Sequence, residues 1–292
     1  MFEDIKRNKI KTNAIIGAFI LIITLIVYYI CMAFDLGYVS IFIALFFSIS
    51  SAYTSYYNCD KIVLKMNKAR PATPEEFKKL NNILDSLMIS SGLHFRPKLY
   101  VMDDDQPNAF ATGRDPAHSV ICVTTALLDK LDYYELEGVL AHELSHIANF
   151  DIRLSAIVTV MVGVIVMLAD MFSRTTLHRR SDRDSDSKGN GIIMLIGLIC
   201  LIISPIFAKL MQLAVSRRRE YLADATAVQY TRNPNGLISA LIKISEDPNE
   251  LKNASKSTAH MYISSPFRSN TTNLFSTHPA TEDRIEALRN IK

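Results

Sequence analysis

The sequence predicts an α+β fold that is mostly helical and contains four transmembrane helices. Four apolar segments, each about 19 to 22 residues long, match the ~20 residues that a helix needs to cross a ~30 Å hydrocarbon core. Hydrophobic residues make up 49% of the 292-residue chain, charged residues make up 21%, and the mean hydropathy is +0.15. The polar remainder contains three short β-prone runs among several helical patterns, which indicates one small sheet among helices.

The first two apolar segments, residues 14–34 and 36 to about 56, predict an N-terminal transmembrane hairpin over residues 1–56. Basic residues precede the first segment, as they do in a secretory signal peptide. A cleaved signal peptide is disfavoured because the apolar core is long, no A-x-A cleavage site follows it, and a second span begins at once. We therefore expect an uncleaved anchor.

The third and fourth apolar segments, residues 154–172 and 191–211, predict a second transmembrane hairpin. The polar parts, residues 57–153 and 212–292, then form a single domain of ordinary size. We expect the hairpin 154–211 to be inserted into this domain.

Lysine and arginine residues predict the orientation, because cytoplasmic loops are enriched in both. They precede the first span, follow the second, and flank the outer ends of the second hairpin. Both termini and both polar parts are therefore expected in the cytoplasm. The loop 173–190 opposes this assignment with five basic residues, although its Ser, Asp and Arg content is typical of a solvated segment.

Composition excludes two other classes of protein. The net charge of +3 is too small to indicate nucleic-acid binding, and no interleaving of aromatic and basic residues supports it. The four cysteines form no C-x-x-C pair, so their spacing fits neither a disulfide framework nor a cysteine zinc site.

Local signals predict the elements of the polar domain in order. Thr73, Pro74 and Glu76 form a capping box at the start of a helix that Gly92 ends. A second capping box, from Asp132 to Glu135, opens another helix. The β-prone runs are 97–103, 108–113 and 119–128, and the later helical patterns cover 209 to about 230, 233–244 and 279–291.

The run H-E-L-S-H at residues 142–146 is the main chemical signal. On a helix, His142 and His146 lie four residues apart on one face, so both imidazoles can bind one tetrahedral zinc ion. Glu143 then lies beside the metal, where its carboxylate can act as a general base toward water. A pair of surface histidines is the alternative interpretation.

A catalytic zinc ion needs a third protein ligand and an open position. No histidine follows His146 at short range, so this ligand must come from further along the chain. Glu220 and Asp224, four residues apart on a predicted helix, could bind the metal and orient a ligand histidine respectively. This pattern alone is common on solvated helix faces. Two predicted spans separate His146 from Glu220, and an even number returns both to the same side of the membrane.

We expect the helix of His146 to continue unbroken into the third span, because no proline lies between residues 139 and 172. His146 lies 8 residues before that span, roughly 12 Å of helix, and Glu220 lies 9 residues after the fourth, roughly 14 Å. The site is therefore expected within roughly 15 Å of the bilayer.

Two motifs, A-H-E-L-S-H-I-A-N and S-R-R-R-E-Y-L-A-D-A-T-A, flank an apolar hairpin. Together they resemble the HtpX family of bacterial membrane zinc metallopeptidases, relatives of the CaaX prenyl-protein endopeptidases. The resemblance covers nearly the whole chain. It implies a zincin-like catalytic domain that faces the cytoplasm at the bacterial inner membrane and one zinc ion per subunit. It also implies proteolysis of misfolded or damaged membrane proteins, as part of quality control under stress.

Residues 108–113 resemble the substrate-binding edge strand of this family. The resemblance implies that Asn108 bonds a substrate backbone while Ala109 and Phe110 pair with it as an added strand. A turn asparagine after Pro107 is the alternative interpretation of Asn108.

Residues 276–285 resemble the C-terminal motif of the family. The resemblance makes His278 a catalytic candidate, and Arg284 a candidate for stabilising the oxyanion. A histidine near a helix start and a surface arginine are the alternatives.

Other functions place different demands on the sequence. A structural zinc site would need a fourth protein ligand, and none is apparent near these motifs. A transporter would need polar residues deep in its spans, where only Asp170 qualifies, near a membrane edge. A signalling peptidase with one specific substrate is the closest rival. We expect membrane-protein substrates and the lipid bilayer as partners, no nucleic acid, and self-cleavage in a mobile segment over residues 252–272.

Overall fold

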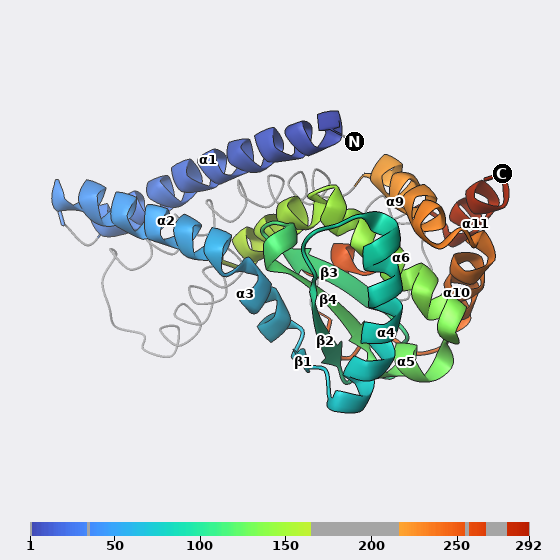
Figure 1. Cartoon of the computed structure of the whole chain (residues 1–292). Helices are drawn as coiled ribbons and strands as arrows, with labels where there is room; N and C mark the ends of the chain where they lie inside the picture. The colour runs from blue at the N-terminus through green and yellow to red at the C-terminus, as the bar shows by residue number, and fades with distance from the viewer. Residues whose placement is uncertain (1, 34–35, 165–215, 255–256, 267–278, 292) are drawn as a thin grey trace.

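The computed structural model describes residues 2–33, 36–164, 216–254, 257–266 and 279–291. Its N-terminal part is a pair of long helices, α1 (Phe2–Ala33) and α2 (Val39–Tyr57), which lie side by side and extend away from the rest of the molecule (Figure 1). The segments Asn8–Tyr29 and Val39–Tyr57 are both long and apolar enough to cross a membrane. The first predicted pair of spans is thus confirmed as two candidate spans.

A four-stranded sheet of order β1-β2-β4-β3 lies at the centre of the polar domain. β2 and β4 are parallel, whereas β1 and β3 run antiparallel to their neighbours, so β3 lies at an edge of the sheet. Each of the three predicted β-prone runs therefore contains a strand, but residues 125–128 of the third run belong to the helix α5 (Thr125–Lys130). The bounds are β1 (Arg70–Pro71), β2 (Lys98–Met102), β3 (Ala109–Gly113) and β4 (Ser119–Thr124).

Helices surround this sheet, and α6 (Tyr133–Ala148) is the central one. It contacts β3 and β4, and α4, α9 and α10 pack around it (Figure 1). Its apolar residues join the main hydrophobic core together with those of α4 and α10. The other helices are α3 (Cys59–Met66), α4 (Pro74–Ser91), α5 (Thr125–Lys130), α9 (Arg217–Thr231), α10 (Pro234–Glu246) and α11 (Thr281–Arg289).

Both predicted capping boxes are present. The Thr73 hydroxyl accepts a hydrogen bond from the backbone N–H of Glu76, whose carboxylate accepts one from the N–H of Thr73. Asp132 and Glu135 make the same reciprocal bonds at the start of α6. Gly92, with φ +66°, ends α4 in the left-handed conformation that glycine adopts without a Cβ clash.

Two glycines set the position of α6 against α10. A Cβ on Gly138 would lie 2.7 Å from the backbone nitrogen of Leu237, and one on Gly236 would lie 2.5 Å from the carbonyl oxygen of Tyr134. The two helices therefore touch through their backbones. This contact fixes the depth at which α6 lies in the core.

The predicted unbroken helix between His146 and the third span is wrong. α6 ends at Ala148, a second helix runs over Asp151–Val164, and the two axes are bent by 82°. Phe150, between them, has φ +59°, a left-handed conformation that ends a helix without any proline. The distance of roughly 15 Å from the bilayer, which assumed a continuous helix, therefore loses its basis.

Four spans were expected. Among the described residues, two single helices are long and apolar enough to cross a membrane. The third expected span is described only as far as Val164. This part is long and apolar enough to cross a membrane only when it is taken together with α6 as one bent pair. Residues 191–211 lie outside the described part of the chain. The Asp151–Val164 helix packs Leu154 and Ile157 against Ile15 and Phe19 of α1 in a second core cluster. Here the described start of the third expected span and the helix α1 are in contact.

Candidate metal centre

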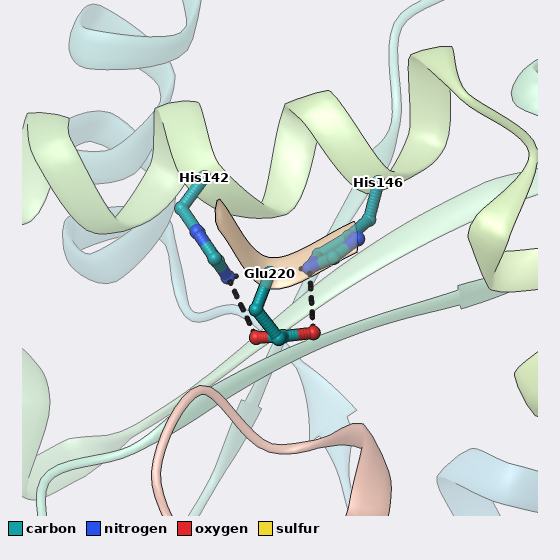
Figure 2. A group of neighbouring side chains, drawn as sticks. All are labelled: His142, His146 and Glu220. Carbon is teal, nitrogen blue, oxygen red and sulfur yellow. Dashed lines mark hydrogen bonds and ion pairs between the residues drawn. The ribbon is translucent and has the colours of Figure 1, made fainter. Parts of the chain in front are cut away.

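His142 and His146 project from one face of α6, as the sequence predicts (Figure 2). Their Nε2 atoms lie only 3.2 Å apart. His142 is buried, while the side chain of His146 keeps 16% of its surface exposed. Other residues of α6, such as Val139 and Leu140, lie in the hydrophobic core and hold the histidine face in place.

Glu220, in the first turn of α9, faces both histidines. Its Oε2 lies 3.8 Å from Nε2 of His142, and its Oε1 lies 3.7 Å from Nε2 of His146. One ligand atom from each of the three residues lies within 4.8 Å of the other two. The packing of α9 against α6 thus brings together a group that the sequence spreads over two distant segments.

The other ring nitrogen of each histidine faces a carboxylate. Nδ1 of His142 lies 2.9 Å from Oδ1 of Asp224, and Nδ1 of His146 lies 3.1 Å from Oδ2 of Asp151. A carboxylate accepts a hydrogen bond, so this pairing favours the proton on Nδ1 and leaves the lone pair on Nε2. Both lone pairs then point toward Glu220.

These donors fit a zinc ion. Zinc–nitrogen bonds of about 2.0–2.1 Å in a tetrahedral site separate two ligand nitrogens by roughly 3.3 Å, close to the separation of the two Nε2 atoms. Two lone pairs and a carboxylate facing one another repel unless a cation lies between them. Two imidazoles and one carboxylate are also the ligand set of many catalytic zinc sites.

Arg284 of α11 binds Asp224 from behind. Its Nε and Nη2 donate to the two carboxylate oxygens at 2.8 and 2.7 Å, and its Nη1 donates to the carbonyl oxygen of Ile263 at 2.8 Å. Burial raises the pKa of Asp224, but the guanidinium outweighs it and holds that pKa at about 2. This geometry favours a role in positioning Asp224, and thereby His142, over the oxyanion contact that the resemblance implied.

Glu143 lies next to His142 in the sequence, beside the candidate metal ligands, and is 1% exposed. Burial raises the pKa of its carboxyl to about 7, although the nearby His146 acts in the opposite direction. The backbone of Ala111, in the edge strand β3, also acts to lower this pKa. A carboxylate whose pKa lies near neutrality suits a general base.

A cavity opens beside these groups and reaches the edge strand. Residues of α6, α9, β3 and the segment 260–263 line this cavity. The residues are Ala111, His142, Glu143, His146, Asp151, Ile152, Ser155, Ser216, Arg219, Glu220, His260, Met261, Tyr262 and Ile263.

The outer side of β3 carries a segment of the chain itself. The carbonyl oxygen of Ala109 accepts a 2.9 Å hydrogen bond from the N–H of Ile263. The side-chain amide of Asn108 donates to the carbonyl oxygen of Ser264 at 3.0 Å, and its oxygen accepts from the N–H of Ser264 at 3.4 Å. These are the backbone contacts that the sequence predicted for a substrate.

Phe110 and Tyr262 form an antiparallel bridge on the same edge, and their rings meet edge to face at 5.2 Å. Thr258, His260 and Ile263 are also buried. Within the segment 252–272, which the sequence analysis expected to be mobile, residues 260–263 are therefore buried beside β3, and self-cleavage there stays a prediction.

Other predictions have different outcomes. His278 lies outside the described residues. Asp224 lies beside Nδ1 of His142, where it can orient that ring as the sequence analysis expected. Asp151 was missed, although it follows the motif five residues after His146, because an unbroken helix would have pointed it away from that ring.

Comparisons with known proteins agree with this geometry. The peptidase family M48 matches residues 74–292. A "Protease HtpX homolog" of Dictyoglomus thermophilum is 46% identical over 288 residues, which cover 99% of this chain and 94% of the relative. Proteins of the same name from Caldanaerobacter subterraneus subsp. tengcongensis and Ligilactobacillus salivarius are 42% and 39% identical, cover all of this chain, and are themselves 98% and 100% covered.

A crystal structure of S. mikatae Ste24p aligns with 96% of this chain and 64% of its own length, at 22% identity and a TM-score of 0.47. This likeness is too distant to carry an argument. The family match and the full-length relatives are enough by themselves: the chain is a metalloendopeptidase that belongs to peptidase family M48 and, within it, to the HtpX proteases.

Proposed function

We propose that this protein is a zinc-dependent endopeptidase of the bacterial inner membrane that cleaves misfolded or damaged membrane proteins at the cytoplasmic face. The observation that carries the proposal is the group of His142, His146 and Glu220 beside Glu143 and an edge strand. The first three would hold one zinc ion. Quality control under stress is the role that this substrate class implies.

A zinc ion at these ligands would supply Lewis acidity, which acidifies water and polarises a peptide carbonyl. Glu143 would take a proton from the attacking water and deliver it to the leaving amine. Asp224 and Arg284 would keep His142 in the tautomer that binds metal. His278 remains a candidate for contact with the reacting carbonyl.

A substrate would bind as an added strand on β3. The proposal is supported by the segment 262–264, which makes the same contacts with Asn108 and Ala109 that an extended peptide would make. A substrate must therefore take the place of this segment or extend beyond it. Self-cleavage would require the segment to leave the edge strand first.

The substrate class follows from this binding mode and from the neighbouring membrane helices. Strand addition needs free backbone N–H and C=O groups, which a folded transmembrane helix does not offer. Loops and unfolded parts of membrane proteins offer both. The transmembrane hairpin proposed for residues 154–211 would be inserted in the catalytic domain and hold the site near the membrane.

The direct test compares the purified full-length protein with its Glu143→Gln variant. The variant should bind one zinc ion per subunit, as the wild type does, and show no cleavage of an unfolded membrane-protein substrate, because the general base is absent. A folded soluble protein serves as the substrate control. Cleavage by the variant at the wild-type rate would refute the mechanism. In a separate survey of substrates, cleavage of one protein alone would favour a signalling peptidase with one specific substrate.

The strand-addition mode is tested by Ile263→Pro, which removes the N–H that bonds Ala109. If substrates compete with the segment for β3, the KM for an unfolded substrate should fall. The temperature of unfolding is the control. A higher KM in a protein of unchanged stability would mean that the segment helps to bind substrate.

The cytoplasmic orientation is tested at Ile89, which is 85% exposed on α4. In a variant whose four native cysteines are replaced by serine, Ile89→Cys should react with a membrane-impermeant thiol reagent in inverted membrane vesicles and not in intact cells freed of the outer membrane. The opposite result would reverse the proposed topology.

A further inference from the structure

Asp151 makes three contacts at the bend between α6 and the helix that follows. One carboxylate oxygen, Oδ2, accepts a hydrogen bond from Nδ1 of the ligand His146 at 3.1 Å. The other oxygen, Oδ1, accepts from the side-chain amide of Asn8 at 2.8 Å and from Nη1 of Arg219 at 3.4 Å. Asp151 is only 5% exposed, so water does not replace these partners easily.

Asn8 reaches this carboxylate from α1, the first candidate membrane helix. The same amide nitrogen donates at 3.2 Å to the carbonyl oxygen of Asn149, one of the carbonyls left unbonded at the end of α6. Its neighbour Lys9 lies 4.6 Å from the centre of the Phe150 ring. The N-terminal end of α1 thus holds all three residues of the bend.

Asn8 is itself 5% exposed, and its amide is the neutral donor that bonds both a carboxylate and a carbonyl. The ring of His146 follows Asp151, because a hydrogen bond to Nδ1 fixes both the tautomer and the direction of Nε2. A chain of contacts therefore runs from α1 through Asn8 and Asp151 to a metal ligand.

We infer that Asp151 is a positioning residue for His146 and that Asn8, on the membrane helix α1, fixes Asp151 in that role. The inference rests on the proposed metal site, and it makes the N-terminal membrane helix a structural part of that site. A change in how α1 packs against the bend would then alter metal binding without touching a ligand.

The test measures zinc affinity of the full-length, detergent-solubilised protein by competition with a chromophoric chelator, independently of cleavage. Asp151→Asn should weaken zinc binding roughly 10- to 100-fold, the usual effect of losing a carboxylate behind a ligand histidine. Asn8→Ala should weaken it roughly three- to tenfold, as expected when Asp151 loses one of its hydrogen bonds. The absorption spectrum of bound Co²⁺ should shift in both variants.

The matched control is Thr12→Val, one turn further along α1. Thr12 is fully buried, and its hydroxyl donates only to the backbone of Asn8 among the bonds that the described residues show. Its replacement should leave zinc affinity and the Co²⁺ spectrum unchanged, because the side chain of Asn8 remains in place.

A double-mutant cycle separates positioning from general destabilisation. If Asn8 acts through Asp151, Asn8→Ala should have no further effect on zinc affinity in the Asp151→Asn background. Additive effects, or wild-type affinity in both single variants, would overturn the inference. If Asp151→Asn does not fold, Asn8→Ala alone decides by its affinity. A wild-type protein that binds no zinc would instead refute the proposed metal site.

Discussion

The two histidines proposed as zinc ligands are supported in parallel ways by different regions of the molecule. Behind His142, Asp224 is held by two hydrogen bonds from Arg284. Behind His146, Asp151 is held by the amide of Asn8 and, at longer distance, by Arg219. The first support lies entirely within the catalytic domain, whereas the second reaches the membrane helix α1.

The difference lies in charge and in the elements that are joined. The Asp224–Arg284 pair is fully buried and ionic, with both groups in helices packed on α6 and its neighbours. In the Asp151–Asn8 pair, a neutral amide bonds the carboxylate, and the two residues lie 143 positions apart in the sequence. In the proposed metal centre, one histidine is therefore supported by contacts within the catalytic domain, and the other is supported by a contact with α1.

The largest effect is expected at Glu220, which faces both histidines. Glu220→Ala should reduce zinc to a small fraction of one ion per subunit, because it removes a ligand that faces both histidines. Metal analysis after dialysis measures this loss. Asp224→Ala should lose less, roughly 10- to 100-fold in affinity. Full zinc occupancy in Glu220→Ala would mean that another residue is the third ligand.

The next largest effect is expected at the Asp224–Arg284 pair behind His142. Arg284→Met leaves the carboxylate of Asp224 buried without its cation, which costs about 3–5 kcal/mol of unfolding free energy. Denaturant unfolding measures this change.

The control for that variant is Arg96→Met, which breaks an exposed ion pair with Asp85 and should cost at most about 1 kcal/mol. Equal losses in the two variants would show that the buried pair has no special importance. The loss in Arg284→Met should also be the same in thin and thick detergent micelles, because no membrane helix takes part.

The smallest effect should come from Arg219, whose contact with Asp151 is long and whose side chain is 14% exposed. Arg219→Gln should weaken zinc binding less than about threefold, because the lost contact of 3.4 Å is long and Asn8 still donates to the same oxygen of Asp151. The same chelator competition measures it. A loss as large as that of Asp151→Asn would mean that the arginine, rather than α1, is the main support of His146.

Local sequence patterns determined much of the fold. The capping residues at Thr73 and Asp132 start their helices because their bonds span only three residues. The periodicity of apolar residues likewise predicted α4 and α10, and the length of the apolar runs predicted the first two spans. The spacing of His142 and His146 fixed their common face, because four residues are about one helical turn. These features depend on neighbours in the chain, which the sequence shows directly.

The tertiary structure alone decided the remainder. The bend at Phe150 carries no proline or glycine signal, and it became visible only with the contacts that Asn8 and Lys9 make there. The segment 262–264 lies on β3 through bonds between residues more than 150 positions apart. Asp151 supports His146 only because that bend turns it back toward the ring. Such contacts depend on which surfaces pack together, and no periodicity within one segment encodes that choice.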